Sequence, residues 1–477
     1  MNSRNLPLKF IVIGASIAGL TSAYLLRQSG HDVEVVEKRH RGEKVNDGHI
    51  RVPPNMTRLL QTIPGTEELL KKASWVSGVS FVSGETMKLL GEMVFIEEVM
   101  SDLGSEFYYI EHADLIAHLY NLCRDARVRF HHGFNVKEVL VDFNDPPTVV
   151  SDTGTRLTGD IVVGADGKRG LTRQIVAVDE TDSEDEFEDD SRSNSTHEPR
   201  DVVMLAFHFL PSESIQRVTT SFSAVMTIPV SELEKDPELA PLVKDDRFVI
   251  WAGNGSCLSG GRAGSLFGVV YHDARGPITP EEPDTEWDES VSTSTLESRI
   301  KQYHPRLQKL VRIASACRRT ATHLIPLTRF TDHTNSLVVI GDAAHVVISS
   351  CTHNGSIATE DAFTLGRLFS RVTSRDQVPL LLSGYNQIRR KRSEALEDAE
   401  FRGTDIVAVP PGPHRDARDA FFAQTLHMDA ADDETLYSIW SSYLEAFSYD
   451  AIDAVDEWWL TWGKPIQDAG VVTNGIH

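Results

Sequence analysis

The chain has few cysteines, no long apolar run and no excess of positive charge. Its four cysteines show no CxxC spacing: Cys123, Cys257, Cys317 and Cys351. This composition excludes a disulfide scaffold and favours a reduced, metal-free protein. No apolar run approaches 18 residues and no signal-peptide core precedes Phe10, so we expect a cytoplasmic protein without a membrane span. The formal net charge of −23 makes nucleic acid an unexpected partner.

The length and the charge distribution indicate more than one domain. At 477 residues, the chain is too long for one simple core, and we expect two intertwined domains with a helical appendage. Nine of the twelve residues from Asp179 to Asp190 are acidic. Such a run favours a solvated, disordered loop inserted in the fold, which we place at residues 179–200.

A short apolar strand at the N-terminus runs into a turn of small residues. The strand covers residues 10–13, a helical pattern follows, and a second apolar strand over residues 33–37 ends in an acid. Strand, small-residue turn, helix, strand and acid in this order are typical of a dinucleotide-binding βαβ unit. A buried βαβ unit without a ligand is the alternative.

Each residue of this pattern has a physical role. Gly14 permits a tight turn, Ser16 and Ala18 let backbone N–H groups approach a pyrophosphate, and Gly19 lets the helix pack closely on the strand. The partial positive charge of the helix N-terminus favours phosphate there. Glu37 lies 23 residues after Gly14, where its carboxylate can accept hydrogen bonds from ribose hydroxyls. It would repel a 2′-phosphate, so FAD or NAD fits better than NADP.

Further elements follow from hydrophobic periodicity. A buried strand ends in Gly164-Ala165-Asp166-Gly167, and another ends in Gly341-Asp342-Ala343-Ala344-His345. Helices are predicted over residues 113–123, 296–311 and 355–369. An antiparallel series is predicted over residues 128–134, 136–143 and 148–153, and further strands over residues 76–95, 108–110, 202–210, 219–228, 247–252 and 265–270.

The glycine blocks at residues 14–19, 164–167 and 341–345 together resemble those of the FAD-dependent, salicylate-hydroxylase-like (group A) aromatic monooxygenases of fungal secondary metabolism. The resemblance extends to residues 50–55, 113–115, 385–392 and 411–419. It implies an α/β fold, in which a Rossmann-like FAD-binding domain (PHBH-like) is interwoven with a mixed β-sheet substrate domain and followed by a C-terminal helical segment. The FAD-binding domain would comprise residues 1–75, 111–178 and 321–400, the substrate domain 76–110 and 201–320, and the helical segment 401–477.

The family also implies a reaction. NAD(P)H reduces FAD, O₂ adds at the flavin C4a carbon, and the resulting hydroperoxide delivers one oxygen atom to the substrate. We expect hydroxylation, epoxidation or oxidative rearrangement of a bulky natural-product intermediate by a monomer or homodimer.

Several positions carry over to the cofactor. Glu37 would bind the adenosine ribose, Gly48 would touch the flavin through its backbone, and Asp342 would reach the ribityl or pyrophosphate region. Gly355 and Ser356 would open a helix whose N–H groups stabilise negative charge on the flavin. The cofactor site is expected to comprise Gly14, Ser16, Ile17, Ala18, Gly19, Glu37, Lys38, Gly48, His112, Asp342, Gly355 and Ser356.

Departures from the family pattern are concentrated at functional positions. His112 and His208 replace family arginines, and Ser259 replaces a family tyrosine. His208 is the candidate acid or base, and His49 and Arg51 are the candidates for orienting the substrate; His353 is a similar candidate.

These losses leave two alternatives open. One is a repurposed fold that catalyses a non-redox cyclisation or isomerisation, and the other is a non-enzymatic flavin-binding protein. The basic run Arg389-Arg390-Lys391-Arg392 is interpreted as a solvated helix face.

Overall fold

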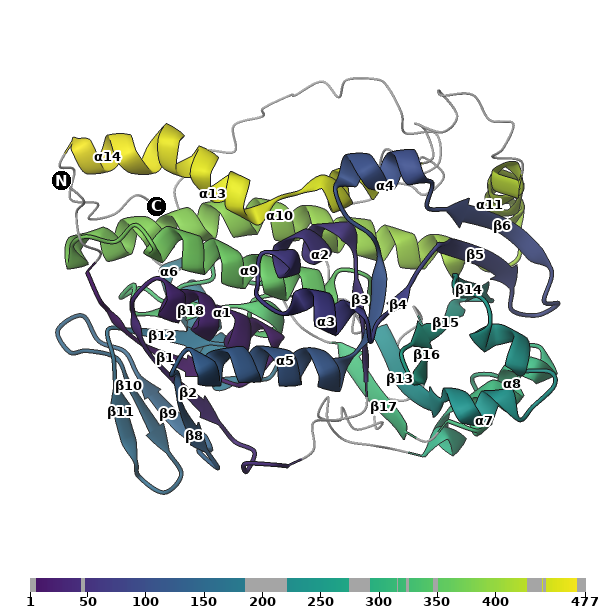
Figure 1. Ribbon diagram of the computed structural model, residues 1–477, viewed down its shortest axis with the longest axis horizontal. Helices are drawn as coiled ribbons and strands as arrows, with labels where there is room; N and C mark the ends of the chain where they lie inside the picture. Colours follow the sequence, from purple (N-terminus) through teal and green to yellow (C-terminus); the bar gives the residue numbers. More distant parts are fainter. Residues whose placement is uncertain are drawn as a thin grey trace.

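The computed structural model describes residues 6–43, 48–184, 221–273, 292–314, 316–322, 326–345, 351–426, 440 and 443–469. Figure 1 shows a parallel sheet on the left, a larger mixed sheet on the right, and the long helix α10 (Val378–Val407) extending along both. Helix α10 contacts helix α9 (Asn354–Phe369) as well as strands of the mixed sheet. It therefore joins the two halves of the molecule.

Four of the five short strands of the parallel sheet are mainly apolar and almost wholly buried, whereas the edge strand at residues 129–132 is partly exposed. In spatial order these are β18 (Leu337–Val339), β12 (Ile161–Gly164), β1 (Lys9–Ile13), β2 (Asp32–Glu37) and β8 (Arg129–His132). Continuous β-branched runs are typical of parallel strands covered on both faces. Helix α1 (Ile17–Gln28) connects β1 to β2 and packs against α9 and against α5 (His112–Asp125). The predicted βαβ unit is confirmed.

The predicted antiparallel series over residues 128–153 is wrong in its first member. Strand β8 pairs in parallel with β2, with Glu34 opposite Arg129. The antiparallel sheet consists instead of β9 (Val136–Leu140), β10 (Thr148–Ser151) and β11 (Arg156–Thr158). Gly133, at φ +69°, turns the chain out of the parallel sheet between β8 and β9.

The mixed sheet has seven strands from distant parts of the chain. In spatial order these are β17 (Ala316–Thr322), β13 (Ser221–Pro229), β16 (Leu266–Asp273), β15 (Ser256–Ala263), β14 (Phe248–Ala252), β5 (Gly78–Ser83) and β6 (Leu89–Val94). All neighbours are antiparallel except β14 and β5, which are parallel. A second hydrophobic core lies between one face of this sheet and residues of α7 (Val230–Glu234) and α8 (Pro305–Arg312).

The predicted helix over residues 296–311 is divided. A 3-10 turn covers Thr293–Leu296, and α8 begins only at Pro305. His304 caps α8, since its Nδ1 accepts a hydrogen bond from the Arg306 N–H at 3.2 Å. Proline lacks an N–H and fits the first turn of a helix but not its interior, so the residues before it cannot continue into α8.

A three-stranded sheet and several helices complete the described residues. The sheet consists of β3 (His49–Val52), β7 (Tyr108–Glu111) and β4 (Ser74–Trp75). The helices are α2 (Pro54–Gln61), α3 (Thr66–Leu70), α4 (Glu97–Leu103), α6 (Leu171–Glu184), α11 (Pro413–Gln424), α13 (Ala451–Trp458) and α14 (Lys464–Asp468). Helix α6 continues to Glu184, so the loop predicted from residue 179 is wrong at its start; residues 185–200 lie outside the described residues.

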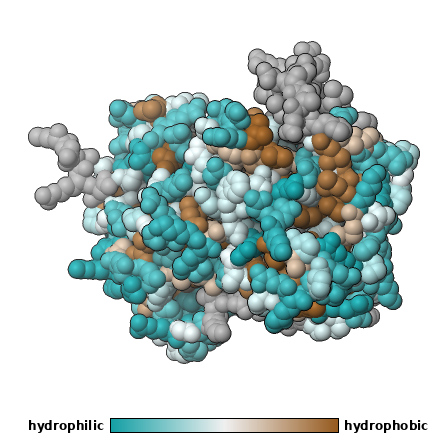
Figure 2. Space-filling model, turned by 45° about the vertical axis from the view of Figure 1, so that its right-hand side comes forward, coloured by the Kyte–Doolittle hydropathy of each residue, from teal (hydrophilic) through white to brown (hydrophobic). Residues whose placement is uncertain are grey.

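The surface is mostly hydrophilic. Figure 2 shows one face on which hydrophobic residues form separate patches rather than one continuous band. Near the C-terminus, Trp458 is buried against Gly384 of α10, whereas Leu460 and Trp462 are exposed. Among the helices that the structure describes, none combines the length and the apolarity needed to cross a bilayer.

Candidate active site

The β1–α1 turn is in backbone contact with the turn after β12. Gly14 has φ +102°, and a Cβ there would lie 2.5 Å from the Ala165 carbonyl oxygen. A Cβ on Gly19 would lie 2.0 Å from the Gly14 carbonyl oxygen, so only glycine fits at either position. The Ser16 Oγ caps α1 by accepting the Gly19 N–H at 3.1 Å. The N–H groups of Ile17 and Ala18, in the first turn, have no acceptor within the helix and remain available for a phosphate.

Glu37, at the end of β2, is 7% exposed and closes this turn. Its Oε2 accepts the Ala15 N–H at 2.8 Å, and its Oε1 accepts the backbone N–H and the Nε–H of Arg39, each at 3.0 Å. Burial alone would raise the pKa of Glu37, but the hydrogen bonds and the charge of Arg39 outweigh it and hold the pKa below its ordinary value. A carboxylate has lone pairs for about four hydrogen bonds, so one site remains for a ribose hydroxyl. The neighbouring Lys38 is exposed.

The third glycine block meets the first one directly. Gly341 follows β18 with φ +60°, and a Cβ there would lie 2.9 Å from the Ala18 Cβ. The next residue, Asp342, is half-buried and makes no hydrogen bond to any residue that the structure describes. The three glycine blocks therefore converge at the N-terminus of α1, with a carboxylate at their edge. This backbone cradle and this carboxylate fit a dinucleotide such as FAD.

The remaining predicted cofactor residues lie at the starts of β3, α5 and α9. The Gly48 carbonyl accepts the backbone N–H of His112 at 2.9 Å, which ties the start of β3 to the start of α5. Gly355 is buried in the first turn of α9, where a Cβ would lie 3.0 Å from the Ile50 Cγ2. The Ser356 hydroxyl donates to the His353 carbonyl at 3.1 Å. The first N–H groups of α9 have no acceptor within the helix, so they are available to a ligand group such as the polar edge of a flavin.

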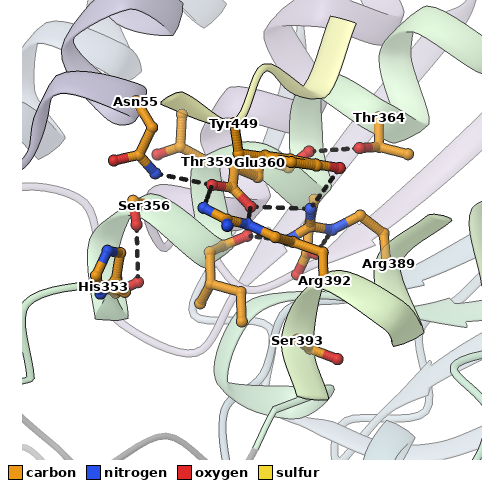
Figure 3. Close-up of polar contacts among 12 residues, drawn as sticks. Asn55, His353, Ser356, Thr359, Glu360, Thr364, Arg389, Arg392, Ser393 and Tyr449 are labelled. Atoms are coloured by element: carbon orange, nitrogen blue, oxygen red, sulfur yellow. Dashed lines mark hydrogen bonds and ion pairs between the residues drawn. The ribbon is translucent and has the colours of Figure 1, made fainter. Parts of the chain in front are cut away.

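A buried ionic network holds α9 to α10 (Figure 3). Arg389 donates from Nε to Asp361 at 2.6 Å and from Nη1 to Glu360 at 2.9 Å. Arg392 donates from Nη2 to Glu360 at 3.0 Å, and the Asn55 amide donates to the same carboxylate oxygen at 2.8 Å. Burial would raise the pKa values of both carboxyls, but the facing cations outweigh it and lower them. Both acids are therefore ionised inside the protein.

This network corrects the interpretation of the basic run. Arg389 is fully buried and Arg392 is 7% exposed, whereas Arg390 and Lys391 face solvent. A solvated helix face is thus wrong for two of the four residues. The network also reaches the cofactor cradle, because Asp361 accepts the Gly341 N–H at 2.7 Å and pairs with His345 Nε2 at 2.8 Å.

Arg51 occupies the space between the nucleotide-binding half and the mixed sheet. Its Nη1 donates to the Thr352 hydroxyl and its Nη2 to the Ser259 hydroxyl, each at 3.2 Å. Its guanidinium carbon lies 4.0 Å from the centre of the Phe248 ring. Within the described ranges Arg51 forms no ion pair at contact distance, although its charge acts on the nearby Glu400 carboxylate. Sequence reasoning did not identify Thr352 as a partner of Arg51, since nothing in the sequence around it is distinctive.

The other two candidate catalytic histidines have different outcomes. His49 packs edge-on against Tyr109, with ring centres 4.9 Å apart, and its ring occupies the space above Gly268 of β16. A Cβ on Gly268 would lie 2.3 Å from that ring, so the glycine makes room for the histidine. His208 lies outside the described residues.

The face of the mixed sheet that contacts Arg51 is largely apolar. Ser259 stands in a cross-strand row with Ile250, Val270 and Val225, and paired residues of adjacent strands share a face. Ile250 and Val225 are half-buried. This surface therefore combines an apolar wall with one hydroxyl and a neighbouring guanidinium, the kind of lining that small-molecule sites use.

An open pocket of about 770 Å³ lies beyond Tyr109 and Phe248. Its wall is mainly charged and polar, and its lining residues are Lys71, Lys72, Ala73, Ser74, Trp75, Val76, Tyr109, Glu111, Asp114, Val243, Lys244, Asp245, Asp246, Arg247, Phe248, Gly261, Arg262, Gly264 and Ser265. Arg51 contacts the Phe248 ring, so this pocket borders the substrate side of the site.

Comparisons with known proteins agree with this geometry. The family described as FAD binding domain matches residues 8–400. FAD-dependent monooxygenase OpS4 of Beauveria bassiana (strain ARSEF 2860) is 24% identical over 464 residues, which cover 96% of this chain and 98% of OpS4. Hispidin-3-hydroxylase of Neonothopanus nambi is 23% identical over 402 residues, which cover 81% of this chain and 86% of that protein.

Solved structures share the fold across nearly the whole chain. Native FqzB has a TM-score of 0.71 at 17% identity, covering 98% of this chain and 96% of its own. CtdE in complex with FAD and substrate 4 has a TM-score of 0.72 at 16% identity, covering 96% of this chain and 100% of its own. A salicylate hydroxylase substrate complex has a TM-score of 0.64 at 20% identity, covering 94% of this chain and 97% of its own.

A fold in which a parallel sheet and a glycine cradle serve a dinucleotide, beside a mixed sheet, defines the FAD-dependent flavoprotein monooxygenases of group A. The chain belongs to this FAD-binding-domain family and is an oxidoreductase. The predicted fold class and family are confirmed.

Proposed function

We propose that the protein uses NAD(P)H and O₂ to place one oxygen atom on an electron-rich aromatic or similarly unsaturated natural-product intermediate. Hydroxylation is the main outcome proposed, with epoxidation or oxidative rearrangement as variants of the same chemistry. The observation that supports the proposal is the convergence of three glycine blocks at α1, in a chain that also places Arg51 against Ser259 of the mixed sheet. The partners are a small-molecule substrate and O₂, and the chain acts as a monomer or homodimer.

The chain's own groups would bind and orient the cofactor. The N–H groups of Ile17 and Ala18 would hold the pyrophosphate, Glu37 the adenosine ribose, and Asp342 the ribityl chain or pyrophosphate. The first N–H groups of α9 would face the polar edge of the flavin. Bound FAD would supply hydride acceptance from NAD(P)H and activation of O₂.

The proposed division of the chain follows from the same placement. Segments 1–75, 111–178 and 321–400 would bind FAD, and segments 76–110 and 201–320 would form the substrate side.

Arg51 would orient the substrate by pairing with its electron-rich or anionic group, because a guanidinium is charged at all physiological pH values. Arg51 has no ion pair at contact distance among the described residues, so a bound anion would be its first direct ionic partner.

The relatives suggest a substrate class to test. Hispidin-3-hydroxylase and 3-amino-4-hydroxybenzoate 2-monooxygenase of Streptomyces cremeus are both named for hydroxylated aromatic substrates. Purified protein should show oxidised-flavin absorbance and should oxidise NAD(P)H faster with a phenolic substrate present. Product formed under ¹⁸O₂ should carry one labelled oxygen atom. A colourless protein that cannot be loaded with FAD, or substrate turnover without NAD(P)H and O₂, would overturn the proposal in favour of non-redox chemistry.

A further inference from the structure

The segment between the third glycine block and α9 carries a buried histidine paired with an acid. His353 Nδ1 lies 2.6 Å from Glu400 Oε1, and the same oxygen accepts the His353 backbone N–H at 2.9 Å. Two contacts from one residue fix both the position and the ring orientation of the imidazole. Because a carboxylate is an acceptor only, Nδ1 carries the hydrogen and Nε2 presents its lone pair.

The Nε2 atom of this histidine lacks a partner. His353 is 6% exposed, and among the described residues Nε2 is buried and makes no hydrogen bond. A buried polar atom left unpaired costs about 1–3 kcal/mol. A polar group of a bound ligand would complete this atom and remove that cost.

The histidine stands beside the substrate-facing arginine. Thr352, the residue before it, accepts the hydrogen bond from Arg51 at 3.2 Å. The charge of Arg51 also helps to lower the pKa of Glu400, although burial acts in the opposite direction and the hydrogen bond from His353 contributes more. The pair and the guanidinium therefore share one electrostatic environment.

From this geometry we infer that His353, oriented by Glu400, accepts the proton of an aryl hydroxyl group on the substrate, and that Arg51 stabilises the resulting phenolate. The inference rests on the proposed function and names its substrate class, a phenol. The O–H bond breaks, its electron pair remains on the substrate oxygen, and the proton forms a new N–H bond at Nε2. Glu400 stabilises the imidazolium, which later returns the proton to the product or to solvent. A phenolate ring is more electron-rich than the neutral phenol and therefore accepts an electrophilic oxygen more readily.

The other ionisable groups around the pair are unsuited to this step. Burial raises the pKa of Tyr443 to about 12 and that of the Cys351 thiol well above its ordinary value, so both stay protonated near neutral pH. Arg51 stays a cation, and the charge of Lys168 reaches Cys351. The unpaired Nε2 of His353 is therefore the acceptor that remains among these groups.

The test uses FAD-loaded protein and 4-nitrophenol or 4-nitrocatechol, whose ionised forms are coloured. Difference spectra recorded across a pH series give the apparent pKa of the bound phenol without any turnover. For the wild type, we expect this pKa to lie at least about one unit below that of the free phenol, a tenfold gain in phenolate. His353→Asn and Glu400→Gln should each abolish most of that shift, and Arg51→Met should also weaken binding. His414→Asn, a change at an exposed histidine of α11, should leave the shift unchanged.

The outcomes separate this inference from the proposed function. If His353→Asn and Glu400→Gln load FAD and keep the wild-type shift, the inference is wrong while the proposed function stands. If the wild type ionises neither phenol on binding, the inference is also wrong. The flavin spectrum and far-UV circular dichroism of each variant confirm folding, and Glu400→Gln preserves side-chain volume if the asparagine variant does not fold. Failure of the wild type itself to bind FAD would refute both proposals together.

Discussion

Replacing Arg389 with methionine should destabilise the protein far more than the same replacement at Arg390. The two residues are adjacent in α10, but Arg389 is fully buried and pairs with Asp361 and Glu360. Arg390 is exposed and pairs only with Glu394 at 2.9 Å, one helical turn away. The two variants remove the same chemical group from a buried and from an exposed position of one helix.

The magnitudes follow from the environment of each charge. Removing one partner of a buried ion pair leaves an uncompensated charge and costs about 3–5 kcal/mol. Removing one partner of an exposed pair at this spacing costs roughly 0.3–0.5 kcal/mol. We therefore expect the Arg389→Met variant to unfold at clearly lower urea concentration, with Arg390→Met close to the wild type.

The measurement is urea unfolding at pH 7, followed by circular dichroism and by tryptophan fluorescence. The two probes should give the same transition, which is checked because a chain of this size need not unfold in two states.

The pKa values of Glu360 and Asp361 are lowered in the folded protein, since the facing cations outweigh the effect of burial. Stability contributed by acids with lowered pKa values is present above about pH 4 and is lost as the pH falls further. The difference in unfolding free energy between the Arg389→Met and Arg390→Met variants should therefore become smaller below about pH 4. Coinciding unfolding midpoints at pH 7 would refute the assigned role of the network.

Three further predictions address other parts of the molecule. Burial lowers the pKa of His272 to about 4 despite the nearby acid. As the pH falls, the unfolded chain therefore binds this proton first, and the free energy of unfolding should fall by roughly 3 kcal/mol between pH 6.5 and 4. His272→Asn should flatten this pH dependence and His414→Asn should not; the same pH dependence of stability in both variants would contradict the prediction. Gly19→Ala places a Cβ 2.0 Å from a carbonyl oxygen, so it should abolish FAD loading measured by flavin absorbance, and normal loading would show that the turn can shift. Asp342→Asn should weaken FAD binding about tenfold, a loss of one charge-assisted hydrogen bond, measured by flavin fluorescence titration; unchanged affinity would remove Asp342 from the site.

The nucleotide-binding half was predictable because its signals are local. A buried strand, a glycine turn and a helix start follow one another within a few residues at Gly14 and again at Gly341. The contacts that require these glycines, with Ala165 and Ala18, involve distant residues, but the conformation they require is encoded at each turn. Each turn can therefore be recognised from its own short stretch of sequence, without knowledge of its distant contacts.

The buried face of α10 could have been found from the same periodicity. Residues at alternating spacings of three and four share one face of a helix. Leu382, Tyr385, Arg389, Arg392 and Leu396 follow this spacing and are all buried. The charge of Arg389 and Arg392 suggested that they face solvent, whereas their position on the apolar face of the helix indicated burial. The acids that neutralise them lie on another helix, α9. A basic run should thus be assigned residue by residue to helix faces rather than as a unit.

The substrate side was the least predictable part because its contacts span the chain. Arg51 donates to Thr352 across 301 residues and to Ser259 across 208, and no window of sequence contains both partners. Strand β8 was misplaced for a similar reason, since its neighbour β2 is far away in sequence. Arg51 was selected from its expected place near the flavin, and its role in orienting the substrate stays a prediction.

Helix α9 links the stability of the protein to the geometry of its site. Its first turn contains Gly355 and Ser356, which we propose to face the flavin, and Glu360 and Asp361 in its next turn pair with arginines of α10. Because Asp361 also accepts the Gly341 N–H, one buried carboxylate fixes two of the segments that form the cradle. A buried ion pair is a poor source of net stability compared with apolar packing, so we expect its value here to be positional: through Asp361 it fixes α9 relative to α10 and to Gly341.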